Sequence, residues 1–470
     1  MRKIGFLKFV VLGFFAISSV MQMTSCANIV PPGGGPRDSL PPYLVAAKPH
    51  DSSINSQPKE ILIAFNEYIQ STSIQENLVV SPSLKTTPLI DAKLNVLKIR
   101  IIDTLKPNTT YSLEFGNAIK DVNEGNIAKN FTYVFSTGNH LDTGNLTGTV
   151  NLAETGKIDT TLIVVLQPAE KDSAIFKEKP LYYTRINGKG KFSFHFLPPY
   201  TYHVFVLPSD YSKKYDDSTK LFAFANEPIT IQAHNDSIRL YVFQGAKKVE
   251  KRRTTNKANN KAGAVLKFSR NFDGTEQDQL KPLLLGFETP VHFNDSFPIT
   301  LCDTLNNKLS GYKIYIDSLH AETVVIDYPW KQLTKFHLIL PKASIKDSLN
   351  NTLTKTDTLA FTTKSDAAYG ACVFRMTGVD EKLNQILQLT QEDKVKFSYP
   401  LTKSTINVEK LPPGEYVLKI LNDTNQNGKW DTGSYFGKVK KQPEIVQMLS
   451  TPLTIKPNWE NEIILIINNK

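Results

Sequence analysis

The sequence predicts an all-β protein of four serial β-sandwiches, arranged as an A-B-A′-B′ duplication. Short runs rich in Val, Ile, Thr, Tyr and Phe alternate apolar with polar residues, and clusters of Pro, Gly, Asn and Asp interrupt them. Long amphipathic helical patterns are scarce. With 470 residues and 40% hydrophobic content, the chain can bury several cores, and its length suggests about three or four domains.

The first 25 residues have the composition of an export signal. Basic residues open the segment, Phe9 to Val20 form an apolar stretch too short to span a bilayer, and small residues lead to Cys26. The ending Met23-Thr24-Ser25-Cys26 resembles a bacterial lipobox. The resemblance implies signal cleavage before Cys26, acyl chains on Cys26, and a mature protein held to a membrane by lipid. An ordinary secretory signal with an incidental cysteine is the alternative.

Residues 26–42 are predicted to form a tether. Pro31 to Pro36 and the Pro41-Pro42 pair favour neither helix nor interior strand, and at about 3 Å per residue the tether would reach roughly 50 Å from the lipid. No later segment has the apolar length of a membrane span, so lipid would be the only anchor. Ala27 is not the aspartate that retains many lipoproteins in the inner membrane. By analogy the outer membrane is favoured, with its face left open.

Charge and cysteine content limit the function classes. The net charge of +10 falls to +7 once the three basic residues before Cys26 are removed, and no nucleic-acid-binding motif accompanies it. We therefore expect no nucleic-acid partner. Cys302 and Cys372 fall in adjacent predicted domains. Each is expected to be a small buried apolar residue rather than half of a disulfide, because nothing in their spacing requires a bridge.

Two ordered sets of repeats define the predicted domains. Ile119-Lys120-Asp121 and Ile345-Lys346-Asp347 stand 226 residues apart. Downstream, a Leu-Pro-Pro turn before a Tyr-rich strand begins at Leu197 and again at Leu411. The Lys-rich, polar segment 245–263 is predicted to be a solvated linker rather than a binding patch. The remaining units have the size of β-sandwiches: 43–138 (A), 139–244 (B), 264–365 (A′) and 366–470 (B′).

Motifs in the first predicted domain resemble a known family. Pro107-Asn108-Thr109, Gly125-Asn126 and the ending Phe135-Ser136-Thr137-Gly138 are similar to the bacterial Ig-like domain of surface-layer proteins. The resemblance covers about Pro42 to Gly138. It implies an Ig-like sandwich for this segment.

The other predicted domains resemble families more loosely. In A′, Leu333 or Thr334 replaces Pro107, and Asn350-Asn351 stand where Gly125-Asn126 stood. Domains B and B′ resemble prealbumin-like sandwiches of the carboxypeptidase-regulatory type. The whole chain resembles uncharacterised Ig-like lipoproteins of the Bacteroidota, and that resemblance implies no known activity.

One segment carries a candidate metal site. Residues 423–431, with the sequence DTNQNGKWD, reproduce the first nine positions of an EF-hand-type calcium loop, in which Gly428 would permit the sharp turn. Ser434 stands where the pattern expects a bidentate glutamate, so we expect a structural Ca²⁺ bound at about 0.1 to 1 mM. An Asx-rich hairpin turn without metal is the alternative. The predicted ligands are Asp423, Asn425, Asn427, Asp431 and the backbone carbonyl of Lys429.

The sequence contains no recognisable catalytic pattern. It has no Gly-x-Ser-x-Gly elbow, no Gly-rich phosphate loop and no histidine pair at helical metal-ligand spacing. His195 is predicted to face solvent, because it is out of phase with the neighbouring phenylalanines. Aromatic residues could form a sugar-binding platform, although aromatics in sheets are mostly core residues. The candidates are Tyr182, Tyr183, Tyr200, Tyr202, Trp430 and Tyr435.

Together these patterns predict a non-catalytic cell-envelope lipoprotein that acts as a structural or protein-interaction scaffold. A carbohydrate-binding or adhesive surface lipoprotein is the main alternative, and an enzyme would need a site that motifs do not reveal. The expected partners are a membrane, through the lipid anchor, and an envelope protein or glycan. No cofactor is expected besides the candidate Ca²⁺.

Overall fold

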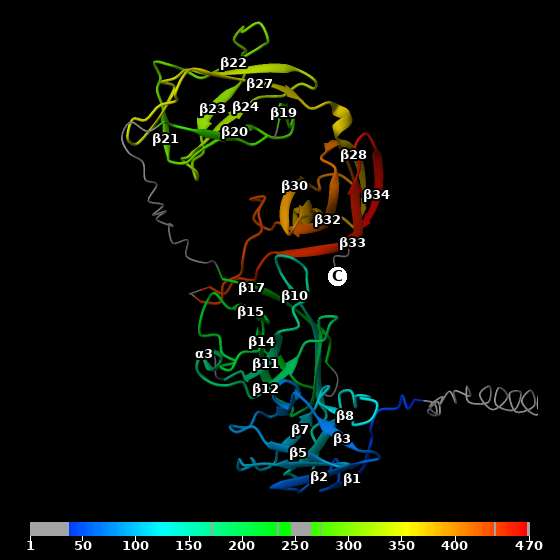
Figure 1. Ribbon diagram of the computed structural model, residues 1–470. Coiled ribbons are helices and arrows are strands. Elements are labelled where there is room, and N and C mark those ends of the chain that lie inside the picture. Colours follow the sequence, from blue (N-terminus) through cyan, green and yellow to red (C-terminus); the bar gives the residue numbers. More distant parts are fainter. Residues whose placement is uncertain are drawn as a thin grey trace, which may run out of the picture. The chain divides into compact units, whose positions relative to one another are not determined.

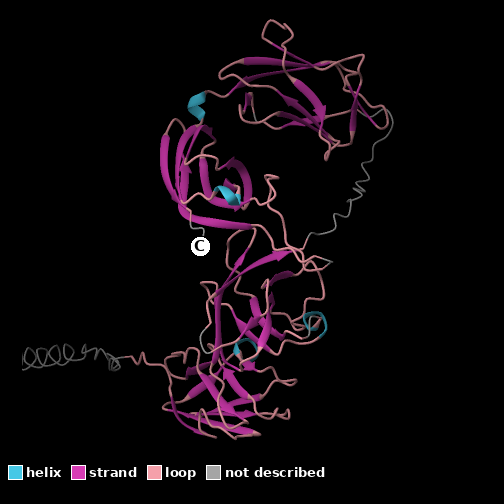
Figure 2. Cartoon of the chain, turned by 180° about the vertical axis from the view of Figure 1, so that it is seen from behind, coloured by secondary structure: helices cyan, strands magenta, loops and turns pink. Residues whose placement is uncertain are grey.

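The computed structural model describes residues 37–170, 173–232, 235–245, 265–272, 274–436 and 439–467. Strands dominate, and the α-helices α2 (Ile74–Asn77) and α3 (Ala174–Lys177) each have four residues (Figure 2). This confirms the all-β prediction. The predicted signal peptide, Cys26, most of the tether and the linker beyond residue 245 lie outside the described residues. Within the described residues, no helix has the length and apolarity needed to cross a bilayer.

The chain forms two units that meet between Thr143 and Gly144. The first unit contains sandwich A (37–143), coloured blue to cyan in Figure 1. Its strands are β1 (Leu44–Lys48), β2 (Glu60–Phe65), β3 (Ile69–Ser71), β4 (Val79–Ser81), β5 (Leu89–Lys93), β6 (Val96–Arg100), β7 (Thr110–Glu114), β8 (Ile119–Asp121) and β9 (Thr132–Ser136). They form the sheets β1-β2-β6-β5 and β4-β7-β9, with β3 paired to β8.

Alternation along the strands of sandwich A builds its core. Ile61, Ile63 and Phe65 of β2 point inward and are at most 1% exposed. Across the antiparallel ladder, Ile61 pairs with Ile99 and Ile63 with Leu97. The period of two therefore sends one face of each strand to the core, as the sequence predicted. Each such buried side chain contributes about 1.5 to 3 kcal/mol through removal from water.

The second unit contains three further sandwiches, of which A′ (265–365) has the strand order of sandwich A. Its strands are β18 (Phe268–Arg270), β19 (Glu276–Gln277), β20 (Leu283–Phe287), β21 (Val291–Phe293), β22 (Thr300–Cys302), β23 (Lys313–Ile316), β24 (Thr323–Asp327), β25 (Lys335–Leu340), β26 (Ile345–Asp347) and β27 (Asp357–Thr363). They form the sheets β18-β20-β24-β23 and β19-β27-β25-β22, with β21 paired to β26. The short parallel strand β19 stands where sandwich A has a single parallel bridge, between Ser53 and Phe135.

One threonine fixes the same loop in sandwiches A and A′. Thr137 accepts a hydrogen bond from the backbone N–H of Thr109 at 3.0 Å, and Thr363 accepts one from Thr334 at 3.0 Å. Asn108 and Leu333 stand immediately before the two donor residues Thr109 and Thr334. Both have a positive φ, of 47° and 48°.

This alignment corrects one expectation. Because Thr334 corresponds to Thr109, the counterpart of Pro107 is Gln332, and not Leu333 or Thr334. The hydroxyl of Thr109 donates to the carbonyl of Pro107 at 2.8 Å, and that of Thr334 donates to Gln332 at 2.9 Å. The carbonyl is what the motif uses, so the proline ring is not required at this position.

Sandwich B (144–245) is one continuous sheet folded around a core. Its strands are β10 (Gly144–Leu152), β11 (Leu162–Pro168), β12 (Tyr182–Arg185), β13 (Lys191–Leu197), β14 (Thr201–Pro208), β15 (Leu221–Phe224), β16 (Ile229–Thr230) and β17 (Ile238–Gln244). The order is β12-β11-β14-β15-β17-β10-β13, with β16 also paired to β14. His195 on β13 is exposed, which confirms its predicted orientation.

Sandwich B′ (366–467) uses the same framework without the pairing that makes the sheet of B continuous. Its strands are β28 (Gly370–Thr377), β29 (Gln385–Gln391), β30 (Lys394–Pro400), β31 (Thr405–Leu411), β32 (Gly414–Asn422), β33 (Ile445–Ile455) and β34 (Glu460–Ile466). They form two separate sheets, β31-β28-β34 and β30-β29-β32-β33. In both sandwiches the first strand has an antiparallel and a parallel neighbour, and a bulge follows its first glycine, Gly144 or Gly370.

The two described cysteines are buried free thiols in adjacent sandwiches. Cys302 lies in A′ and Cys372 in B′. Burial raises the pKa of Cys372 to about 11, so this thiol stays protonated and unreactive at neutral pH.

Candidate functional site

The predicted calcium loop begins the long connection between β32 and β33. Asp423 is 2% exposed, and its carboxylate accepts hydrogen bonds from the backbone N–H groups of Asn427 at 3.2 Å and Gly428 at 2.7 Å. The side-chain amides of Asn425 and Asn427 both donate to Asp431. Gly428 has a φ of 75°, which a glycine adopts without strain. Four of the predicted ligand side chains therefore lie within one compact loop.

Glu444 completes this loop and was not predicted. It is 3% exposed, and one of its carboxylate oxygens accepts from both the backbone N–H and the hydroxyl of Thr424, each at 2.9 Å. The other oxygen accepts from the backbone N–H of Asp431 at 3.0 Å. Glu444 thus ties the two ends of the loop together from just before β33.

Sequence reasoning missed Glu444 because it searched the twelfth position of the calcium pattern. That position is Ser434, which pairs with Lys441 through the backbone and donates its hydroxyl to the carbonyl of Phe436 at 3.0 Å. The one available signal was that Glu444 is an acidic residue directly before a strand. Spacing alone could not show that its carboxylate accepts hydrogen bonds from Thr424 and Asp431.

The donor set of the loop fits a hard cation in type. Carboxylate, amide and carbonyl oxygens are the ligands that Ca²⁺ takes. Here, however, the amide nitrogens of Asn425 and Asn427 face Asp431, and each amide would have to rotate to present its oxygen. Within the described residues, no group of three or more His, Cys, Asp or Glu is placed to hold a metal ion. Calcium binding by Asp423, Asn425, Asn427, Asp431 and the Lys429 carbonyl stays a prediction, as does the metal-free turn.

The same connection packs aromatic side chains onto two sandwiches. Trp430 donates its indole N–H to the Glu444 carbonyl at 2.8 Å, and it packs against Ile386, Leu421 and Val446 in the β29-β32-β33 sheet of B′. Tyr435, five residues further on, is 6% exposed and belongs to a cluster in sandwich B. The connection from Asp423 to Glu444 therefore covers a sheet face in B′ and a sheet face in B.

Three phenylalanines of sandwich B form most of the seat for Tyr435. The Tyr435 ring centroid lies 5.0 Å from those of Phe222 and Phe224 and 5.7 Å from that of Phe205, in an edge arrangement with Phe205. Such tilted and edge contacts add to the burial of the rings themselves. A Cβ at Gly433 would lie 2.8 Å from the ring of Phe243, so a side chain does not fit there.

Hydrogen bonds flank the aromatic seat. The Thr432 hydroxyl donates to the carbonyl of Gln244. The Gln442 amide donates to the carbonyl of Phe224 at 3.0 Å and to the side chain of Asn226 at 2.7 Å. The seat therefore combines a buried aromatic centre with polar contacts at its margin, which is the anatomy of a specific interface.

A second contact joins the β10–β11 turn of sandwich B to B′. The backbone N–H of Val446 donates to the carbonyl of Ala153 at 2.8 Å, and Lys157 pairs with Asp393 at 2.8 Å. Lys419 lies buried beside this pair, with its ammonium 3.8 Å from Asp393. Burial lowers the pKa of Lys419. Two sandwiches that are separated by A′ in the sequence are thus joined at two places.

The aromatic residues considered for sugar binding do not form one platform. Tyr182, Tyr202 and Tyr435 are buried in two different clusters of sandwich B. Tyr200 is 41% exposed, and its hydroxyl donates to Glu170. Tyr183 and Trp430 are half-buried. These rings mainly build cores and the contact between B and B′.

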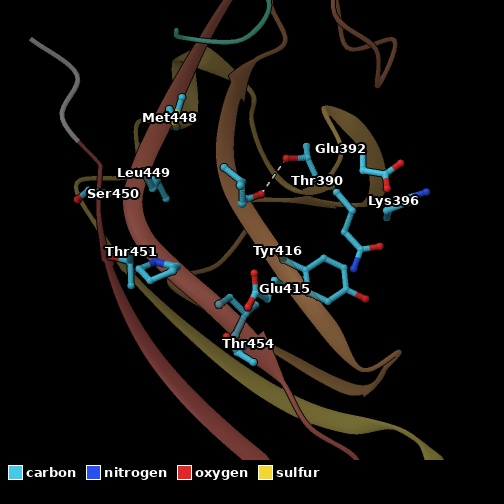
Figure 3. Close-up of a pocket in the computed structure, with 14 residues that line it drawn as sticks. Thr390, Glu392, Lys396, Glu415, Tyr416, Met448, Leu449, Ser450, Thr451 and Thr454 are labelled. Atoms are coloured by element: carbon cyan, nitrogen blue, oxygen red, sulfur yellow. Dashed lines mark hydrogen bonds between the residues drawn. The ribbon is translucent and has the colours of Figure 1, made fainter. Parts of the chain in front are cut away.

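A pocket of about 830 Å³ lies beside strands β29, β30, β32 and β33 (Figure 3). The Thr390 hydroxyl donates to the carbonyl of Val417 at 3.0 Å, and the Tyr416 hydroxyl donates to that of Pro412 at 2.8 Å. Glu392, Lys396 and Glu415 also line the pocket, and neither histidine nor cysteine does so among the described residues. The pocket offers a mixed apolar and polar surface, and none of its described lining residues pairs a nucleophile with a base.

Comparison with known families identifies the first sandwich. Residues 38–137 match the family described as bacterial Ig-like domain. This match confirms the Ig-like prediction for sandwich A, and it covers less than half of the chain. No curated protein matches the chain.

Solved structures show only distant likeness. The TIE protein of Bacillus anthracis is 13% identical, over 93% of this chain and 76% of that one, with a TM-score of 0.16. BcpA, the major pilin subunit of Bacillus cereus, is 7% identical over 70% of this chain and 100% of that one, with a TM-score of 0.18. The N-terminal part of the bacterial S-layer protein SbsC is 12% identical over 44% of this chain and 45% of that one, with a TM-score of 0.16. At TM-scores this low, none of these likenesses supports a conclusion about the chain.

Proposed function

We propose that this chain is a non-catalytic, lipid-anchored scaffold of the cell envelope, whose sandwiches serve as a structural or protein-interaction platform. The observation that carries the proposal is the packing of Tyr435 into sandwich B. This buried aromatic contact joins two sandwiches, which supports a structural role for their arrangement. The Ig-like match of residues 38–137 also supports the proposal, because Ig-like sandwiches host many binding and structural roles.

The duplication A-B-A′-B′ is part of the proposal. Its support is the shared strand order within each pair of sandwiches and the matching threonine contacts of Thr137 and Thr363. An experimental structure of the whole chain would test it: A should superpose on A′ and B on B′, strand for strand. Halves that fail to superpose would contradict it.

The lipid anchor is proposed from the N-terminal sequence alone. If the chain is a lipoprotein like those of the Bacteroidota that it resembles, acyl chains on Cys26 would hold the sandwiches at the outer membrane through the tether 26–42. We expect Cys26→Ala to move the protein from the membrane fraction to the soluble fraction of lysed cells. Cys302→Ala, which removes a buried thiol elsewhere, should stay with the membranes. Continued membrane association of Cys26→Ala would show that the anchor is not lipid on this residue.

The non-catalytic assignment has a separate test. The purified chain should bind an envelope protein that co-purifies from native membranes, and it should leave polysaccharides unchanged and unbound in a pull-down. Retention on a polysaccharide would favour the alternative, a carbohydrate-binding or adhesive lipoprotein. The partner itself would come from the co-purification.

A further inference from the structure

Three cations of sandwich B lie on or beside the edge strand β12: Lys179 shortly before it, Arg185 on it and Lys213 next to its Tyr183. Alternation on β12 turns Tyr182 inward and places Tyr183 and Arg185 on the opposite face. The ammonium of Lys213, in the β14–β15 connection, lies 5.2 Å from the centre of the Tyr183 ring. The ammonium of Lys179, just before β12, lies 4.9 Å from the centre of the Tyr211 ring. Both lysines therefore make cation–π contacts with tyrosines of sandwich B, Lys213 with a half-buried ring and Lys179 with an exposed one.

Among the described residues, no acidic side chain is paired with this cluster. In the described part of the chain, no ion pair is found for Lys179, Arg185 or Lys213. The nearby acid, Asp210, is already engaged: it pairs with Lys220 at 2.6 Å and accepts from the Ser212 hydroxyl at 2.8 Å.

The half-buried position of Lys213 makes the excess charge costly. Burial lowers the pKa of Lys213, and the positive charges of Lys179 and Arg185 lower it further, against a smaller opposing effect of Asp210. Lys179 and Arg185 are exposed and Lys213 is half-buried, and like charges close to a protein surface repel one another more strongly than in bulk water, because the effective dielectric constant there is lower. A bound anion would relieve both the repulsion and the desolvation.

We propose that Lys179, Arg185 and Lys213 form a binding site for a phosphomonoester group. Arginine offers a planar fork that matches two phosphate oxygens, and the two lysines add point charges. A phosphomonoester carries a charge of about −1.5 to −2 at neutral pH, which balances three clustered cations better than one carboxylate does. The group can come from a phosphorylated saccharide or from a lipid headgroup. The site is independent of the proposed anchor and of the scaffold role.

The test uses the purified chain with the substitution Cys26→Ala, which removes the proposed site of acylation so that no acyl chain can insert into vesicles, and two probes. Calorimetric titration with glucose 6-phosphate, with glucose as the blank, measures binding of a sugar phosphate. Sedimentation with vesicles containing phosphatidic acid, against vesicles of phosphatidylcholine alone, measures binding of a lipid phosphomonoester. We expect binding to at least one phosphate probe and to neither neutral probe.

Matched variants separate a specific site from general positive charge. The double variant Arg185→Gln/Lys213→Gln should weaken binding about tenfold or more, since it removes two charge-assisted contacts. The control Arg239→Gln/Lys335→Gln removes the same charge from two exposed residues elsewhere and should bind like the parent. Lys179→Gln, at an exposed position, gives a milder variant if the double variant fails to fold.

The outcomes are decisive in either direction. Binding to glucose 6-phosphate alone would assign the site to a saccharide, and binding to vesicles alone would assign it to a lipid. Failure to bind either probe would overturn the proposal, as would equal weakening in the site variants and in the control.

Discussion

Sandwiches B and B′ share a strand framework and differ in what one corresponding connection does in each. In B, the connection between β14 and β15 runs over residues 209–220, and its Tyr215 stacks on Phe222 of the same sandwich at 3.8 Å. In B′, the equivalent connection runs over residues 423–444, and its Tyr435 enters sandwich B. One loop completes its own sandwich, and the other joins two sandwiches. The framework sets the fold, and loop length and loop chemistry set the role.

The sheets of B and B′ also differ in closure. Strand β15 pairs with both β14 and β17 and makes the sheet of B continuous. In B′, the equivalent strand β33 pairs with β32 alone, which leaves two separate sheets. The strands of sandwich B therefore form one continuous sheet, whereas the two sheets of B′ are not joined to each other by strand pairing.

The largest expected effect comes from removing the ring that joins the two sandwiches. Tyr435→Ala would leave a cavity among Phe205, Phe222 and Phe224, and large aromatic truncations in cores cost about 3 to 5 kcal/mol. Urea unfolding of the full chain should show this loss in the transition that includes sandwich B. Tyr68→Ala, at a tyrosine that is 58% exposed, is the control and should change stability little. Equal losses in the two variants would show that Tyr435 is not an anchor.

A smaller loss is expected when the long connection loses its internal tie. Glu444→Ala would leave the backbone N–H groups of Thr424 and Asp431 without their acceptor, at a cost of about 2 to 3 kcal/mol. Glu444→Gln keeps one acceptor oxygen and should cost less. Thermal unfolding followed by tryptophan fluorescence, in a Trp330→Phe/Trp459→Phe background that leaves Trp430 as the emitter, would report the change locally. A Glu444→Ala variant as stable as the parent would mean that the loop is held from elsewhere.

Calcium should stabilise the loop 423–431 of B′. With a dissociation constant of about 0.1 to 1 mM, a few millimolar Ca²⁺ would stabilise the folded loop by about 1 kcal/mol. The midpoint of thermal unfolding should rise with calcium in the parent, and Asp431→Ala should remove the rise. If calorimetry detects no binding heat and the midpoint stays constant, the metal-free turn is the correct interpretation.

The smallest effect concerns the connection of B, through Asp210. Burial raises the pKa of Asp210, but hydrogen bonds from Lys220, Ser212 and Lys213 outweigh it, and the pKa lies below its usual value. Its contribution is therefore present above the unfolded-state pKa of about 3.9 and is lost as the pH falls through the lowered value. Because this carboxylate is partly exposed, the contribution should be below about 1 kcal/mol. In Asp210→Asn, the free energy of unfolding should fall less steeply as the pH is lowered through the acidic range. The same dependence on pH in the variant and the parent would contradict this assignment.

Local sequence patterns predicted the parts of the fold that depend on neighbours in the chain. The alternation of Ile61, Ile63 and Phe65 gave a core face, and the phase of His195 gave an exposed residue. The Ig-like motifs of residues 42–138 led to the correct family for sandwich A. In each case the signal lies within a few residues of the feature that it predicts.

The pattern failed where function depends on partners far apart in the sequence. Tyr435 was considered a candidate for sugar binding, but its partners Phe205 and Phe222 lie more than 200 residues earlier and complete a buried cluster. Glu444 was missed because it acts on a loop that begins 21 residues before it. Neither periodicity nor motif spacing contains such contacts, since they arise only when two sandwiches pack together.

The central claim is that B′ secures B through Tyr435, and hydrogen exchange tests it most directly. In the full-length chain, Tyr435→Ala should speed amide exchange in peptides that cover β14, β15 and β17, although the substitution lies in B′. The control Tyr68→Ala should leave those peptides unchanged. Faster exchange confined to residues 423–444, with β14, β15 and β17 protected as in the parent, would contradict the account.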